Sequence, residues 1–108
     1  IIDTNFRQPW LWPFGTDGTR STVRVAGRFS VNSARAACDL AVAGAGIVMT
    51  PNFVADPHLG AGRLLPLLTA HAPPPRGIYA VYPHPRHVAR RLRALIDFLV
   101  ARLAPPVD

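Results

Sequence analysis

The chain has 108 residues, of which 49% are hydrophobic, so it is long enough for one domain with a modest core. Its formal net charge is +6, but all 12 basic residues are arginines and most stand singly along the chain, which argues against a nucleic-acid-binding patch. No apolar run reaches the length of a membrane-spanning helix, and no basic start followed by an apolar segment indicates a secretion signal. We therefore expect a cytoplasmic protein with no membrane contact.

The amino-terminal part of the chain predicts mostly extended structure. Residues 1–7 are expected to form a first strand. Residues 10–14 are apolar but interrupted by prolines, and together with the turn-forming sequence at 16–19 they predict an irregular hairpin. Between residues 23 and 29, apolar and polar side chains alternate, which is typical of a strand with one buried face.

The stretch from residue 30 to residue 51 predicts a helix that turns at once into a strand. A helix is expected at residues 33–43. The polar residues Ser30, Asn32 and Ser33 can cap its start, and the alanines that follow provide a buried stripe of small residues. Gly44 is expected to end this helix, because a residue just past a helix end often needs positive φ. Residues 47–50 predict a buried strand that stops before Pro51.

The remaining segments predict a connector, a short strand and a helix. Prolines between residues 66 and 77 favour a stiff connector without regular structure, and residues 78–82 predict a strand. Apolar residues at three- and four-residue spacings from Val88 to Leu103 predict the last helix, which Pro105 and Pro106 would end. The one cluster of basic residues is expected to line a solvated face of this helix: Arg86, Arg90, Arg91 and Arg93.

Several motifs in this order resemble the LysR-type transcriptional regulators of bacteria, in particular the last half of their effector-binding domain. No single motif is specific, but their order and spacing are shared with the family over nearly the whole chain. The motifs are Val31-Asn32, the glycine turn at 43–47, Pro51, the Gly-x-Leu-x-x-x-Leu strand at 62–68, the Tyr-x-x-Tyr-Pro segment at 79–83, and the sequence RALIDFL at 93–99.

The resemblance implies an α/β fold, namely part of a two-lobed periplasmic-binding-protein-like (type 2) effector domain with a mixed sheet and flanking helices. Residues 1–77 would belong to the second lobe, and residues 78–108 would supply a return strand and a C-terminal helix to the first lobe. Family members also carry an N-terminal winged helix-turn-helix, which these residues do not include. We therefore expect a piece of a longer protein that contacts DNA only through that missing N-terminal domain.

Nothing in the sequence indicates an enzyme, a cofactor or a metal site. The four histidines, His58, His71, His84 and His87, do not show the helical spacing of a zinc pair, and Cys38 has no second cysteine. The glycines at 44–46 follow a helix and precede a strand, whereas phosphate-binding loops have the opposite order. We predict no catalytic residue, no metal ligand and no cofactor.

Two function classes stay open. The first is the effector-sensing module of a LysR-type regulator, and the alternative is a lobe of a periplasmic-type solute-binding protein, which shares the architecture. A helix-turn-helix at the start of the full-length gene product would support the regulator, and a signal peptide would support the solute-binding protein. The RALIDFL ending and the sequence VAGAGIVMTP at 42–51 favour the regulator.

Within the regulator hypothesis, polar residues at strand ends and at the helix start on one sheet edge predict the effector site. Such an edge is where ligands sit in open α/β sheets, and a helix N-terminus together with an arginine favours an anionic organic effector. The expected ligand-binding residues are Asn5, Arg7, Ser30, Asn32, Ser33, Thr50, Pro51 and Asn52. The resemblance further implies a homo-oligomer in the full-length protein, formed through the helix at 33–43 and the strand before it.

Overall fold

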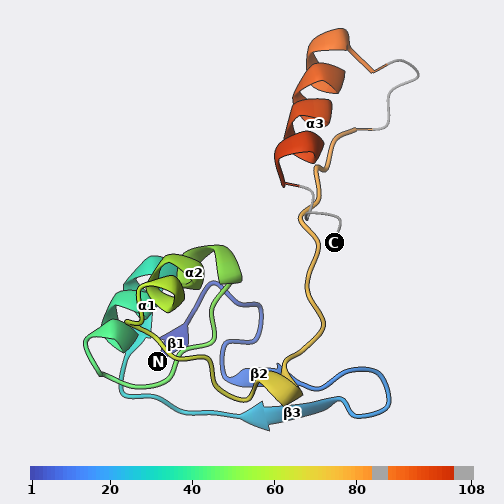
Figure 1. Ribbon diagram of the computed structural model, residues 1–108. Helices are drawn as coiled ribbons and strands as arrows, with labels where there is room; N and C mark the ends of the chain where they lie inside the picture. The colour runs from blue at the N-terminus through green and yellow to red at the C-terminus, as the bar shows by residue number, and fades with distance from the viewer. Residues whose placement is uncertain (84–87, 104–108) are drawn as a thin grey trace. The chain divides into compact units, whose positions relative to one another are not determined.

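The computed structural model describes residues 1–83 and 88–103. The chain forms two compact units, Ile1–Pro75 and Arg76–Asp108, which are described separately here. The assignment of residues 1–77 and 78–108 to two lobes of a larger domain stays a prediction. In chain order the elements are β1 (Ile2–Asp3), β2 (Leu11–Phe14), β3 (Ser21–Arg24), β4 (Ser30–Val31), α1 (Ala34–Val42), α2 (Asn52–Gly60), the 3-10 helix η1 (Thr69–His71) and α3 (Arg90–Leu103) (Figure 1).

The strands of the first unit form two separate ladders. β1 pairs with β4 in parallel, with Ile2 opposite Ser30 and Asp3 opposite Val31. β2 and β3 form an antiparallel hairpin that runs from the Leu11–Arg24 pair to the Phe14–Ser21 pair. The predicted irregular hairpin is thus confirmed, and Pro13 is tolerated in β2 because each strand of a two-stranded ladder has an edge where no donor is needed.

The core of the first unit is small and lies under α1. Ala37 and Cys38 on this helix are fully buried, as is Ile2 of β1, and Ala55 of α2 is buried as well. α1 contacts β1, β4 and α2, so the alanine-rich sequence brings three elements close together (Figure 1). Small side chains permit this close approach, because they keep the axes of packed elements near one another.

The predicted helix at 33–43 is confirmed as α1, including both of its ends. Ser33 is the N-cap, and its hydroxyl oxygen accepts a hydrogen bond from the Ala36 amide. Gly44 follows the helix with φ +83°, and the Ala45 amide donates to the Leu40 carbonyl over 2.9 Å. Local residue chemistry is therefore sufficient to set the boundaries of this helix.

Helix α2 is absent from the sequence-based expectations. Pro57 lies inside it and removes the amide that would bond to the carbonyl four residues earlier, so the pattern argues against a helix. The helix begins directly after Pro51, whose carbonyl accepts hydrogen bonds from the Val54 and Ala55 amides. Ala55 of α2 is buried and α2 contacts α1, and this packing offsets the cost of the proline. The expected unstructured connector likewise contains one short helical turn, η1.

Five strand predictions were wrong in extent or existence. The expected strand at 1–7 is limited to Ile2–Asp3, because the chain turns directly after Asp3. The expected strand at 23–29 is replaced by Ser21–Arg24, whose residues are all exposed, and by the short Ser30–Val31. Residues 47–50, 62–68 and 78–82 are not in any ladder of the described chain. Strands need a partner to satisfy their backbone groups. In residues 47–50 the only backbone group bonded within the described chain is the Ile47 carbonyl, which accepts from the terminal amine of Ile1.

The second unit consists of an extended segment and α3. The predicted C-terminal helix is confirmed as Arg90–Leu103, and its apolar residues include the exposed Leu95, Phe98 and Leu103. The guanidinium of Arg102 lies 5.3 Å from the centre of the Phe98 ring, in the geometry of a cation–π contact. The described residues do not include His84, Arg86, His87, Pro105 and Pro106, so the predictions for these five positions stay predictions.

Candidate functional site

The carboxyl ends of β1 and β4 meet at one edge, and α1 begins there. The parallel pairing places Asp3 beside Val31, and the Thr4 amide donates to the Val31 carbonyl over 2.8 Å. Two residues later the chain from β4 reaches the N-cap of α1. The predicted coincidence of strand ends and helix start is therefore present in the structure.

Asn5 and Asn32 are joined across this edge. The side-chain amide of Asn5 donates to the Asn32 carbonyl oxygen over 2.7 Å, and both residues are exposed. Asn32 is followed directly by Ser33, the cap of α1. Asn5, Asn32 and Ser33, three of the eight predicted ligand-binding residues, thus form one connected group.

A second group of predicted residues lies where α2 begins. Pro51 is the N-cap residue of α2 and Asn52 is its first residue. Thr50 is half-buried, and its hydroxyl oxygen accepts a hydrogen bond from the Cys38 thiol over 3.6 Å. Because Cys38 belongs to α1, both groups contact the same helix.

Arg7 and Ser30 are exposed and are not tied into either group. Within residues 1–83 and 88–103, neither side chain makes a hydrogen bond or an ion pair. Ser30 lies at the start of β4, opposite Ile2, and Arg7 follows the turn after β1. The Arg7 guanidinium is thus available to a bound group, but the described chain does not fix its position.

The start of α1 offers free hydrogen-bond donors at this edge. In the described chain, the amides of Ala34 and Arg35 at the start of α1 have no partner, while the next amide is bonded to Ser33. Helix N-termini carry partial positive charge, and Arg7, four residues after the end of β1, carries a full charge. Such a set suits a small group that accepts hydrogen bonds or carries negative charge.

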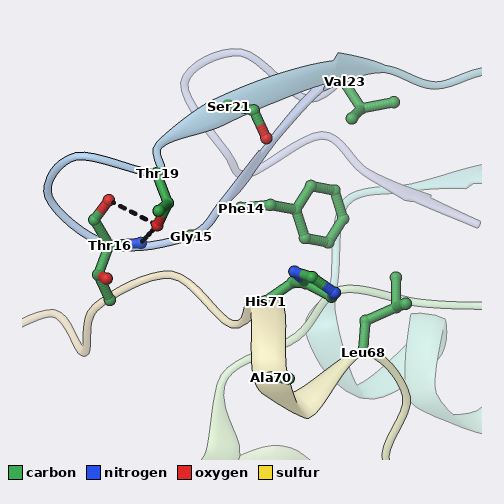
Figure 2. A pocket seen from close by; sticks show the side chains of 9 residues that line it. All are labelled: Phe14, Gly15, Thr16, Thr19, Ser21, Val23, Leu68, Ala70 and His71. Atoms are coloured by element: carbon green, nitrogen blue, oxygen red, sulfur yellow. Dashed lines mark hydrogen bonds between the residues drawn. The ribbon is translucent and has the colours of Figure 1, made fainter.

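Two depressions lie elsewhere on the first unit. One, of about 270 Å³, is between the β2–β3 hairpin and η1, and Figure 2 shows Phe14 of the hairpin and His71 of η1 among its lining residues. The Gly15 amide holds η1 to the hairpin by donating to the His71 carbonyl over 2.7 Å. The other, of about 400 Å³, is lined by residues that include Ile1, Phe29 and Ile47. None of the eight predicted residues lines either depression.

Residues 1–83 and 88–103 contain neither a cluster of metal-ligating side chains nor a helix that could span a membrane. No group of three or more histidine, cysteine, aspartate or glutamate side chains in these residues is arranged to hold a metal ion. Within the same residues, every helix is too short or too polar to cross a bilayer.

Comparison with known protein families gives a match over most of the chain. Residues 3–104 match the model of the LysR substrate binding domain. The chain belongs to this family. The predicted resemblance to LysR-type regulators is therefore confirmed.

Curated relatives of this LysR-family chain are transcriptional regulators. The chain is 38% identical over 99 residues to the HTH-type transcriptional regulator PtxR of Pseudomonas aeruginosa. This match covers 92% of the chain and 32% of PtxR. It is 31% identical over 91 residues to the HTH-type transcriptional activator TtdR of Escherichia coli, covering 84% of the chain and 29% of TtdR. It is also 33% identical over 91 residues to the E. coli LysR family substrate binding domain-containing protein YagP, covering 84% of the chain and 67% of YagP.

The chain thus spans about a third of the length of PtxR and TtdR. No solved structure matches it significantly. The match concerns the substrate-binding part of the family, and the described residues form an α/β arrangement consistent with a piece of such a domain.

Sequence reasoning missed one residue at the edge, Asp3. It is the only buried charged residue in the described chain, at 5% exposed. Its carboxylate accepts a hydrogen bond from the backbone amide of Asn5 over 3.0 Å. The signal was present, because an aspartate that precedes a chain reversal often bonds to the amide two residues later. The apolar start of the chain suggested a continuous strand instead.

Proposed function

We propose that this chain is the second-lobe part of a two-lobed, periplasmic-binding-protein-like (type 2) effector domain, with residues 78–108 returning to the first lobe. In this proposal the intact protein is a LysR-type transcriptional regulator and the chain senses a small molecule. The observation that carries it is the parallel β1–β4 pair ending at the N-terminus of α1, within a chain that matches the LysR substrate binding domain.

The proposed effector is an anionic organic molecule bound at this edge. Support comes from the Asn5–Asn32 link, which holds the Asn5 side chain to the Asn32 carbonyl just before a helix start with two unbonded amides. Arg7 would reach the anionic group, and Ser30, Ser33, Thr50, Pro51 and Asn52 would complete this wall of the site. The opposite wall would come from the first lobe.

The intact protein is further proposed to be a cytoplasmic homo-oligomer that contacts DNA through a domain outside this chain. A regulator must reach the chromosome, which accounts for the location. The names of the relatives PtxR and TtdR, both HTH-type regulators, support the DNA-binding role of the remaining protein. The alternative of a periplasmic solute-binding lobe loses support, because these relatives are regulators.

Calorimetric titration of the intact regulator tests the proposed effector class. The probes are benzoate, succinate and citrate, each compared with its uncharged amide. We expect a carboxylate to bind and its amide to bind far more weakly. The Arg7→Ala variant should lose about 1.5 to 3 kcal/mol of the binding free energy, since a hydrogen bond to a charged group is removed.

Arg20→Ala is the matched control for this experiment. Arg20 is also an exposed arginine, but it pairs with Asp17 at 3.0 Å in the β2–β3 loop. Its loss should leave the affinity unchanged. Equal binding of acids and amides would contradict an anionic effector, and unchanged affinity in Arg7→Ala would remove Arg7 from the site.

A further inference from the structure

Asp3 is a buried carboxylate without a cationic partner in the described chain. Its residue is 5% exposed, and the described residues contain a single ion pair, between Arg20 and Asp17. Burying an unpaired charge costs free energy, and hydrogen bonds recover only part of that cost. The buried Asp3 carboxylate therefore depends on the hydrogen bond that it accepts within the described chain.

The hydrogen bonds of Asp3 shape the turn that follows β1. Its carboxylate accepts a hydrogen bond from the backbone amide of Asn5 over 3.0 Å. Its backbone carbonyl accepts one from the backbone amide of Phe6 over 3.4 Å. Both bonds close the same chain reversal, in which Asn5 is the third residue. The carboxylate thereby determines the backbone position from which the Asn5 side chain extends.

Asn5 in turn connects the turn to the start of α1. Its side-chain amide donates to the Asn32 carbonyl, one residue before the helix cap Ser33. A continuous series of hydrogen bonds thus runs from the buried carboxylate of Asp3 through Asn5 to the junction of β4 and α1.

We propose that Asp3 is the positioning residue of the effector edge, holding Asn5 in place and through it the junction of β4 and α1. This inference rests on the proposed effector-binding function. Asp3 acts through its acceptor oxygen, and the negative charge is dispensable. Asparagine at this position would retain the acceptor, whereas alanine would not.

Hydrogen–deuterium exchange of the intact regulator tests the proposal without any ligand. In Asp3→Ala, peptides covering residues 3–7 and 30–37 should exchange about tenfold faster than in the wild type, because local opening there is no longer opposed by the hydrogen bond. Peptides of the β2–β3 hairpin should keep their wild-type rates. Asp3→Asn should exchange like the wild type throughout.

Three exchange results would overturn the proposal. Unchanged exchange at 30–37 in Asp3→Ala would show that Asn5 does not depend on Asp3. Faster exchange across the hairpin as well would assign Asp3 to general stability. Faster exchange at 30–37 in Asp3→Asn would show that the charge, and not the acceptor oxygen, is required.

A second measurement uses the carboxylate that the wild-type regulator binds most tightly in the calorimetric panel. Asp3→Ala and Asn5→Ala should each weaken binding about tenfold, and the double variant should lose no more than the single variants, because both act through one path. Additive losses would contradict the proposal. If no carboxylate binds to the wild type, the effector proposal fails at this edge, and the exchange measurement by itself decides the role of Asp3.

Discussion

The Cys38 thiol and the Thr50 hydroxyl are 3.6 Å apart and join the middle of α1 to the chain that leads into α2. Cys38 is fully buried and lies beside Ala37, which is also fully buried. These two residues define the inner face of α1. Ala34 and Ala41 on the same helix are only half-buried, so they lie outside the fully buried part of its surface.

The first prediction concerns the half-buried alanines Ala34 and Ala41, beside the fully buried part of α1, as an oligomer interface. Ala41→Arg in the intact regulator should dissociate the oligomer with little loss of protomer stability, because a large charged side chain would occupy the space of a partner. Ala37→Arg provides the contrast, since a charge at a fully buried position should unfold the protomer. Analytical ultracentrifugation and thermal melting distinguish the two variants.

The interface prediction assigns Ala34 the same role as Ala41. Ala34→Arg should therefore also yield a folded, dissociated protomer. If both variants sediment as the wild-type oligomer, or if both unfold, this surface of α1 is not the interface.

The second prediction concerns the cap of α1. Ser33→Ala removes the oxygen that accepts from the Ala36 amide over 3.2 Å, so the free energy of unfolding should fall by about 1 kcal/mol. Ser30→Ala is the control, because the Ser30 side chain is exposed and makes no hydrogen bond in the described chain. Urea unfolding of both variants measures the difference, and an equal effect would exclude the cap as its cause.

The third prediction compares two glycines of the β2–β3 loop that both have positive φ. Gly15 has φ +80° and a methyl group there would overlap the Thr19 carbonyl oxygen, whereas Gly18 has φ +86° and open space around it. Gly18→Ala should cost about 1 kcal/mol from backbone strain alone. Gly15→Ala should cost clearly more, and equal melting temperatures for the two variants would contradict the described loop.

The fourth prediction is that the 108-residue chain does not recognise a DNA sequence in spite of its net charge of +6. Arginines scattered over the chain can neutralise phosphates and support only weak, salt-sensitive association. A gel-shift assay with the regulator's own promoter and with a scrambled duplex measures this. Preferential binding to the promoter at physiological salt would refute the prediction.

Local sequence signals were sufficient for α1 and α3. The boundaries of α1 follow from a serine cap and a glycine with positive φ, and both act within a few residues of the helix end. The periodic apolar residues of α3 are likewise a property of one segment. The predicted edge residues Asn5, Asn32 and Ser33 came from the same kind of local argument, combined with a general rule about strand ends.

What the sequence alone determined about this protein is its family, the two helices with clear caps or periodicity, and the polar residues near one strand edge. Only the tertiary structure decided that β1 is short, that α2 forms across Pro57, and that Asp3 is buried. The physical reason is that pairing and burial depend on segments distant in the chain. The Val31 carbonyl accepts a hydrogen bond from the residue after β1, and α2 packs against α1. Neither contact leaves a pattern within the segment that it stabilises.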